Sequence, residues 1–266
     1  SGAYQAGFGD LNAVIDLAAK RPAEAPVAVY MIYNTPPFTI VVKSDSPIKT
    51  PKDLEGKTVG GPATDAALKL FPGFAKLTGI DASKVNITNM APNLREQMLA
   101  RDQVDATFGY VTTVSFSAKA MGMDPAKDLR FIRYGQYGMD LYSNAVFFAR
   151  DFVKDNPKAV TGFVRALNRA IGDVIANPDM GMDAVMKREP LLKREVEKER
   201  LLFTLRNDMS HPEIARIGLG DVDDKRLAKA IDILVEANQL GRTPSTSEVF
   251  DRSFLPPRDQ RPSKLF

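Results

Sequence analysis

The stretch Val59-Gly60-Gly61-Pro62-Ala63-Thr64-Asp65-Ala66-Ala67-Leu68 predicts a strand, a turn and the start of a helix. Gly60, Gly61 and Pro62 allow the backbone to turn sharply. Thr64 is a suitable N-cap, and Asp65 suits the positive end of the helix dipole. Backbone N–H groups at such a helix start can hold a small polar ligand. An ordinary strand-to-helix turn explains this segment equally well, because it has neither a P-loop lysine nor a dinucleotide-binding glycine pattern.

Strands and helices alternate up to about residue 150, and helices dominate after that. Strands are predicted at residues 5–9, 27–33, 38–43, 57–59, 85–88, 104–109, 129–134 and 142–149. Helices are predicted at residues 51–54, 64–78, 93–100, 157–174, 178–189, 193–207 and 224–239, and in a segment that starts at Leu11 and that Pro22 closes. This alternation indicates an α/β fold with parallel or mixed sheets.

The composition is that of a globular protein. The chain has 266 residues, of which 44% are hydrophobic and 26% are charged. That is enough for two lobes of roughly 100–150 residues each. The net charge is +3 and the basic residues are dispersed, so the basic stripe typical of nucleic-acid binding is missing. No apolar run reaches the ~18 residues of a membrane span.

The residue types present restrict the possible chemistry. The chain contains no cysteine, which excludes disulfides, cysteine–metal sites and thiol catalysis. His211 is the only histidine. We expect His211 and Pro212 to lie in a loop between helices rather than in a catalytic dyad. No metal site and no cofactor are predicted.

Several segments, taken in their order along the chain, resemble one known family. The segment Asp53-Leu54-Glu55-Gly56-Lys57, followed by a strand and a glycine turn, is the most specific of them. The others are residues 2–10, 33–38, 94–99 and 104–106, and Asn156-Pro157 at the start of a long helix. The family is that of the solute-binding proteins of ABC importers for nitrate, sulfonates, taurine and the pyrimidine precursor of thiamine. The resemblance covers nearly the whole chain.

This resemblance implies a type II-like periplasmic binding protein, with two α/β lobes joined by two hinge strands. Residues 1–43 and 143–266 would form the first lobe and the C-terminal helices, and residues 44–142 the second lobe. The N-terminal part of the first lobe and a signal peptide are expected to lie outside this chain. The implied function is to capture a small polar or heteroaromatic solute in the interlobe cleft and deliver it to an ABC permease in the inner membrane. The implied location is the periplasm. The protein is expected neither to catalyse a reaction nor to bind nucleic acid.

Ligands of open α/β sheets lie beyond the carboxyl ends of the strands. This rule selects ten candidate ligand-binding residues: Asp10, Asn34, Thr35, Ala63, Thr64, Asp65, Tyr110, Thr112, Tyr137 and Tyr142. Helix capping, turn formation or core packing would explain the same residues. Arg95 is expected to face solvent. Carboxylates and tyrosines suit a ligand with N–H donors and a flat ring, so a heteroaromatic or amine is favoured over an oxyanion.

Two other functions are considered on the same fold. Some fungal relatives synthesise the thiamine pyrimidine and consume an active-site histidine, with cysteines in a characteristic cluster. The lack of cysteine and the single histidine, His211, disfavour that activity here. The third possibility is a ligand-sensing domain that signals to an attached module.

Overall fold

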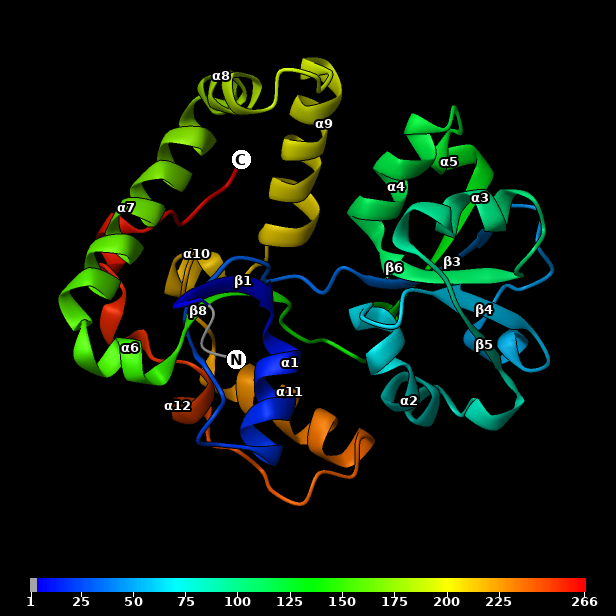
Figure 1. Ribbon diagram of the computed structural model, residues 1–266, viewed down its shortest axis with the longest axis horizontal. Helices are drawn as coiled ribbons and strands as arrows, with labels where there is room; N and C mark the ends of the chain where they lie inside the picture. The colour runs from blue at the N-terminus through cyan, green and yellow to red at the C-terminus, as the bar shows by residue number, and fades with distance from the viewer. Residues whose placement is uncertain (1–3) are drawn as a thin grey trace. The chain divides into compact units, whose positions relative to one another are not determined.

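The computed structural model describes residues 4–266, which form two compact units (Figure 1). Unit 1 contains the chain up to Thr35 together with Leu141–Val235 and Leu240–Phe266, and unit 2 contains Pro36–Asp140 and Glu236–Gln239. Residues 1–3, which include Gly2 and Ala3 of the family-like segment, lie outside the described residues. Within residues 4–266, no helix has the length and apolar character needed to cross a membrane.

Unit 1 is built on a three-stranded sheet with the order β1-β8-β2, in which β8 runs antiparallel to both neighbours. Asp10 at the end of β1 pairs with Asn144, and Met31 at the end of β2 pairs with Ala145. The carboxyl ends of β1 and β2 therefore meet beside the start of β8. The elements of unit 1 are β1 (Ala6–Asp10), α1 (Leu11–Lys20), β2 (Val27–Met31), β8 (Asn144–Phe148), α6 (Arg150–Asp155), α7 (Pro157–Ala176), α8 (Pro178–Arg188), α9 (Arg194–Thr204), the π-helical turn η5 (Leu205–Met209), α10 (Ile214–Ile217), α11 (Asp224–Ala237), α12 (Thr246–Val249), η6 (Arg252–Phe254) and η7 (Arg258–Gln260).

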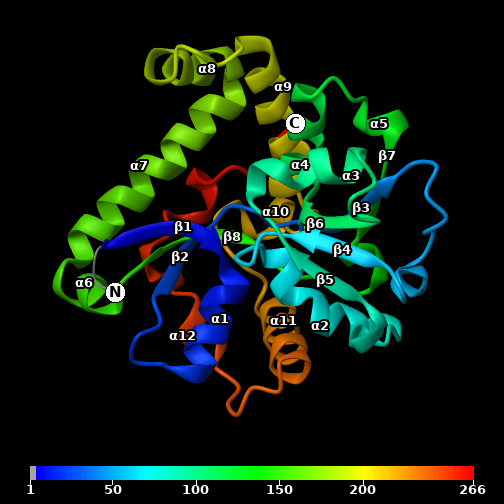
Figure 2. The ribbon, with the colours of Figure 1, turned by 45° about the vertical axis from the view of Figure 1, so that its right-hand side comes forward.

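Helices cover both faces of this sheet (Figures 1 and 2). On one face, Val160 and Val164 of α7 pack with Leu205 of η5 and Ile214 of α10 against β2 and β8. On the other face, α1 contacts β2 and α12, and α11 lies beside α1. The buried face of α7 thus carries Val160 and Val164, whereas Phe163 on the same helix is 47% exposed.

Unit 2 is built on a five-stranded mixed sheet with the order β5-β4-β6-β3-β7. Strand β4 runs parallel to β5 and β6, and β3 runs antiparallel to β6 and β7. The elements of unit 2 are β3 (Phe38–Lys43), η1 (Pro51–Leu54), β4 (Thr58–Gly61), α2 (Ala66–Thr78), η2 (Ala82–Lys84), β5 (Asn86–Asn89), η3 (Pro92–Leu94), α3 (Arg95–Ala100), β6 (Ala106–Tyr110), α4 (Val111–Ala120), α5 (Pro125–Asp128), β7 (Leu129–Arg133) and η4 (Tyr134–Tyr137).

The connections of this sheet create a switch point between β4 and β6. Helix α2 covers one face of the sheet, and α3 and α4 cover the other (Figure 1). The chain leaving β4 leads to β5 on one side, whereas the chain leaving β6 leads towards β7 on the opposite side. Adjacent strands whose connections diverge in this way leave a crevice at their carboxyl ends, which is where open α/β sheets bind ligands.

Gly60 and Gly61 allow β4 to pack closely against neighbouring side chains. Both glycines lie in the strand, which ends at Gly61, so the turn begins at Pro62 rather than at Gly60. A Cβ atom on Gly60 would lie 1.9 Å from Cε of Met90, and one on Gly61 would lie 3.1 Å from Cβ of Phe108. A larger residue at either position would require the side chain of Met90 or of Phe108 to shift.

The structure corrects several predicted elements. The resemblance places residues 38–43 in the first lobe, at the crossing into the second, whereas strand β3 pairs with β6 and β7 and lies in unit 2. Pro72 predicts a kink or a break in the helix at residues 64–78, and α2 continues through it from Ala66 to Thr78. The segment predicted as one helix at residues 193–207 changes to a π-helical turn after Thr204. Helix α4 was not predicted, because its sequence VTTVSFSAKA is rich in β-branched residues that also favour strands.

Candidate ligand-binding sites

The strand ends of unit 1 are joined by a short chain of hydrogen bonds. Asp10 is the N-cap of α1, and its carboxylate accepts hydrogen bonds from the backbone N of Asn12 at 3.3 Å and from Nδ2 of Asn12 at 2.8 Å. The same Nδ2 donates to the carbonyl oxygen of Tyr142 at 2.8 Å. The backbone N of Leu11 donates to the carbonyl oxygen of Ser143 at 2.9 Å. The capping role considered for Asp10 is thus confirmed, and its contact with a ligand stays a prediction.

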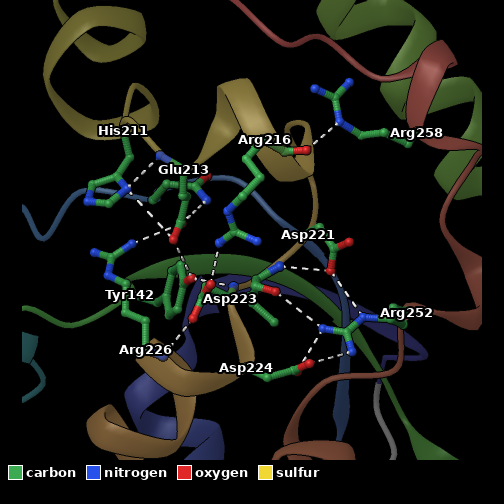
Figure 3. Close-up of polar contacts among 12 residues, drawn as sticks. Tyr142, His211, Glu213, Arg216, Asp221, Asp223, Asp224, Arg226, Arg252 and Arg258 are labelled. Carbon is green, nitrogen blue, oxygen red and sulfur yellow. Dashed lines mark hydrogen bonds and ion pairs between the residues drawn. The ribbon is translucent and has the colours of Figure 1, made fainter.

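A buried carboxylate, Glu213, lies at the centre of a larger network in unit 1 (Figure 3). Its Oε2 accepts a hydrogen bond from the hydroxyl of Tyr142 at 2.9 Å. Its Oε1 accepts from Nδ2 of Asn34 and from a guanidinium N–H of Arg226, both at 2.9 Å. The network thus connects Asn34, which follows β2, with Tyr142, which precedes β8.

Tyr142 is fully buried in this network, and several groups fix its orientation. Its hydroxyl donates to Glu213 and accepts a hydrogen bond from the backbone N of Asp223 at 2.8 Å. The guanidinium carbon of Arg226 lies 4.2 Å from the centre of the tyrosine ring. Burial, followed by the nearby negative charge of Glu213, raises the pKa of Tyr142 far above its usual value. Tyr142 is therefore a neutral hydrogen-bonding group at physiological pH.

Asn34 and Thr35 form a second connection between β2 and the helical segment around residue 210. Oγ1 of Thr35 donates to the carbonyl oxygen of Ser210 at 2.6 Å, and its backbone N donates to the carbonyl oxygen of Asp208 at 2.9 Å. Asn34 is fully buried, and within residues 4–266 its Oδ1 has no hydrogen-bond partner. An unpaired buried amide oxygen is costly, so Asn34 is poised to accept a hydrogen bond.

His211 lies in the loop between η5 and α10, as the sequence predicts. Its Nδ1 accepts a hydrogen bond from the backbone N of Glu213 at 3.3 Å and lies 3.7 Å from Oε2 of Glu213. Glu213 and Arg226 are not among the predicted site residues, because neither follows a predicted strand. Glu213 follows Pro212, and Arg226 lies near the start of the helix at 224–239. Nothing in the sequence around either residue indicates a contact with Tyr142.

Asp65, rather than Thr64, caps α2 in unit 2. Oδ1 of Asp65 accepts hydrogen bonds from the backbone N of Ala67 at 2.8 Å and of Leu68 at 3.2 Å. The prediction of Thr64 as N-cap is wrong, because the helix begins one residue later than expected. Ala63 and Thr64 precede the helix and are exposed.

Arg95 is buried, which overturns the expectation that it faces solvent. The residue is 4% exposed, and its guanidinium donates two hydrogen bonds to Oε1 of Glu96, at 2.9 and 2.7 Å. The third guanidinium nitrogen, Nη1, lies 3.7 Å from Oδ2 of Asp65. A Cβ atom on Gly109 would lie 2.9 Å from this nitrogen. The missing side chain of Gly109, near the end of β6, thus leaves the space that the guanidinium occupies.

The remaining candidates of unit 2 lie on β6, α4 and η4. Tyr110 ends β6, and its half-buried ring packs edge-on against Phe38 with ring centres 5.4 Å apart. Thr112 lies buried in the first turn of α4. Tyr137 lies in η4, is 37% exposed and packs edge-on against Phe74 at 5.9 Å. Contact of these residues with a ligand stays a prediction.

The switch point of unit 2 therefore carries a buried guanidinium between two carboxylates. Asp65 follows β4 and Gly109 nearly ends β6, so the group lies where the two chain connections diverge. An arginine side chain therefore lies beside these strand ends, although the sequence places no arginine at the end of a predicted strand. Asp65 is also already engaged by backbone amides, which weakens the argument for an amine ligand. Within the described residues 4–266, no group of three or more His, Asp or Glu side chains is placed to hold a metal ion.

The pKa of Asp65 leads to a testable prediction about stability. Burial raises this pKa above the usual aspartate value, although the backbone N–H of Leu68 and the charge of Arg95 oppose the shift. Since the folded state holds the proton more tightly than the unfolded state, Asp65 favours folding most at low pH and less as the pH rises through its folded pKa. An asparagine side chain does not ionise, so the Asp65→Asn variant should not lose this stability as the pH rises. We therefore expect its free energy of unfolding to increase relative to that of the parent between pH 4 and 7. Urea unfolding at several pH values measures it, and a constant difference would contradict the raised pKa.

The fold is that of periplasmic binding proteins. The chain superposes on the periplasmic aliphatic sulphonate binding protein SsuA from Escherichia coli with a TM-score of 0.68 at 16% identity, covering 94% of this chain and 76% of that one. It superposes on the alkanesulfonate-binding protein SsuA from Xanthomonas axonopodis pv. citri, solved with bound MOPS, with a TM-score of 0.67 at 18% identity, covering 94% and 81% of the two chains. The chain belongs to the NMT1/THI5-like family, whose model matches residues 2–180.

Three curated relatives are named for different functions. A riboflavin-binding protein, RibY, of Chloroflexus aurantiacus is 24% identical over 257 residues, which is 90% of this chain and 68% of RibY. A 4-amino-5-hydroxymethyl-2-methylpyrimidine phosphate synthase of Legionella pneumophila is 21% identical over 74% of this chain and 62% of the synthase. A formylaminopyrimidine-binding protein of Halalkalibacterium halodurans is 22% identical over 71% of this chain and 58% of that protein. The chain thus spans about six tenths to two thirds of the length of these relatives.

Proposed function

We propose that this protein is the solute-binding component of an ABC importer, acting outside the cytoplasmic membrane and delivering its ligand to a membrane permease. The observation that carries the proposal is the polar site at the switch point of unit 2. There, Asp65, Arg95 and Tyr110 lie at the carboxyl ends of two adjacent strands, on a fold shared with periplasmic binding proteins. Such a crevice is where α/β folds bind small molecules.

The ligand class that we propose is a small polar heteroaromatic molecule. Two relatives in the family are named for riboflavin and formylaminopyrimidine, which both contain nitrogen heterocycles. The half-buried ring of Tyr110 provides a flat surface on which a heteroaromatic ring can stack.

A thermal-shift panel tests the function. We expect riboflavin or an aminopyrimidine to stabilise the protein, by about 2.7 kcal/mol at a hundredfold excess over Kd, whereas taurine, alkanesulfonates and nitrate have no effect. Tyr110→Ala should lose most of this stabilisation because it removes the stacking surface. Tyr4→Ala, which truncates a tyrosine that is 83% exposed, is the matched control.

The outcome of the panel separates the ligand class from the function. Stabilisation by a sulfonate alone would keep solute binding and overturn the heteroaromatic ligand. Equal ligand response in Tyr110→Ala and Tyr4→Ala would remove the switch point of unit 2 from the binding site. Because one relative is named as a synthase, catalysis is the competing function. Detection of a pyrimidine phosphate product by mass spectrometry would favour synthesis over solute binding.

A further inference from the structure

Unit 1 has a hollow of about 620 Å³ between α7 and the chain segment 256–263. It shares no residue with the strand ends described above. Three arginines line it: Arg165 and Arg169 from α7, and Arg261 from the C-terminal segment. The acidic residues along its wall are Asp173 and Asp259, so positive charge exceeds negative charge there.

Arg261 is a buried cation whose hydrogen bonds and ion pair are long. Its side chain is 6% exposed, and its guanidinium lies 3.4 Å from a carboxylate oxygen of Asp221, which Arg252 also contacts at 3.3 Å. Its other contacts are the carbonyl oxygens of Gly218 and Leu219 at 3.4 and 3.2 Å. Nε of Arg261 is buried and has no hydrogen-bond partner within residues 4–266. A buried charge in such surroundings favours an additional anion.

Arg165 and Arg169 supply two further guanidinium groups. They are four residues apart on α7, so they lie one helical turn from each other on the same face. Both are exposed. In the part of the chain that the structure describes, neither side chain forms an ion pair or hydrogen bond, although Asp173 is one turn further along. Their guanidinium groups are therefore available to a ligand.

We propose that this hollow binds a phosphate-bearing anion. A phosphate group offers several oxygens around one centre, which match the forked N–H donors of more than one arginine, whereas a carboxylate offers two. The volume exceeds the need of one phosphate, so the group attached to it has room. The phosphate belongs either to a soluble phosphate ester or to the headgroup of an anionic phospholipid.

Isothermal titration with inorganic phosphate, at constant ionic strength, tests the soluble case. We expect Arg165→Gln/Arg169→Gln to weaken binding at least tenfold, because it removes the two exposed donors. Lys187→Gln/Arg188→Gln removes two exposed charges at the end of α8, outside the hollow, and should bind as the parent does. Asp173→Asn/Asp259→Asn should bind more tightly, since it removes the acidic groups from the wall.

Flotation with lipid vesicles identifies the source of the phosphate. Binding to phosphatidylglycerol vesicles but not to phosphatidylcholine vesicles, lost in Arg165→Gln/Arg169→Gln, assigns the hollow to a lipid headgroup. Binding of phosphate in solution without vesicle binding assigns it to a soluble ester. The proposal is overturned if the parent binds neither phosphate nor phosphatidylglycerol vesicles, or if both double variants lose binding equally. Solute binding at the strand ends is measured separately and is unaffected by either result.

Discussion

Glu213→Gln is expected to destabilise the protein by about 3–5 kcal/mol, the range measured when one partner of a buried ion pair is removed. Glu213 is 8% exposed and accepts hydrogen bonds from Asn34, Tyr142 and Arg226. The substitution keeps the size of the side chain but leaves the guanidinium of Arg226 beside a neutral amide. Urea unfolding followed by circular dichroism measures the free energy of unfolding.

A control and a double variant make this prediction specific. Glu24→Gln removes the charge of a surface glutamate that pairs with Arg21 and is 60% exposed at its side chain. It should leave the free energy of unfolding nearly unchanged, because exposed ion pairs contribute little. Glu213→Gln/Arg226→Met should cost less than the sum of the single changes, since it removes both charges. Strict additivity would show that Glu213 and Arg226 do not stabilise each other.

Local patterns in the sequence predict the elements that carry the candidate sites. The apolar spacing of α7, the capping acid before α1 and the strand at residues 104–109 each depend on nearby residues, and the structure contains all three. The strand-end rule is also local to each element. It selected Asp10, Asn34 and Tyr142, which the structure brings to the same end of the sheet of unit 1.

The partners of these residues depend on tertiary packing and could not be predicted. Glu213 lies 179 residues from Asn34 and 71 from Tyr142, and no periodic pattern connects segments so far apart. Their hydrogen bonds form only because α10 and α11 pack on unit 1 beside the strand ends. A prediction from sequence needs co-variation between such positions, which one chain cannot provide.

The position of the Arg95 side chain could not be predicted from the residues around it, because it depends on a different element of the fold. On a short helix of mixed polarity, a long cationic side chain ordinarily reaches solvent. Here the cavity for its guanidinium comes from Gly109, which is on a different element, and the charge is matched by Asp65 and Glu96. Glycine in a strand can mark such a close approach, and this signal was present in the sequence.

Arg95→Met is expected to destabilise unit 2 by about 3–5 kcal/mol at neutral pH, because it leaves the buried carboxylates of Asp65 and Glu96 without their cation. The cost should fall as the pH drops and Asp65, whose pKa burial raises, takes up a proton, since a neutral carboxyl needs no counter-charge. Arg101→Met, at an exposed arginine just beyond the end of α3, is the matched control. Urea unfolding at pH 7 and pH 4 compares the two variants.

A second variant separates the structural role of Arg95 from a role in ligand binding. Arg95→Met/Glu96→Gln removes one carboxylate together with the guanidinium, so we expect it to recover much of the lost stability. If this stable variant also fails to respond to the solute that stabilises the parent, the N–H donors of Arg95 or the position of Asp65 are needed for binding. If it responds fully, the ion cluster supports only the fold of unit 2, and ligand contacts must come from Tyr110 and its neighbours. Equal unfolding of Arg95→Met and Arg101→Met at pH 7 would contradict the buried ion cluster itself.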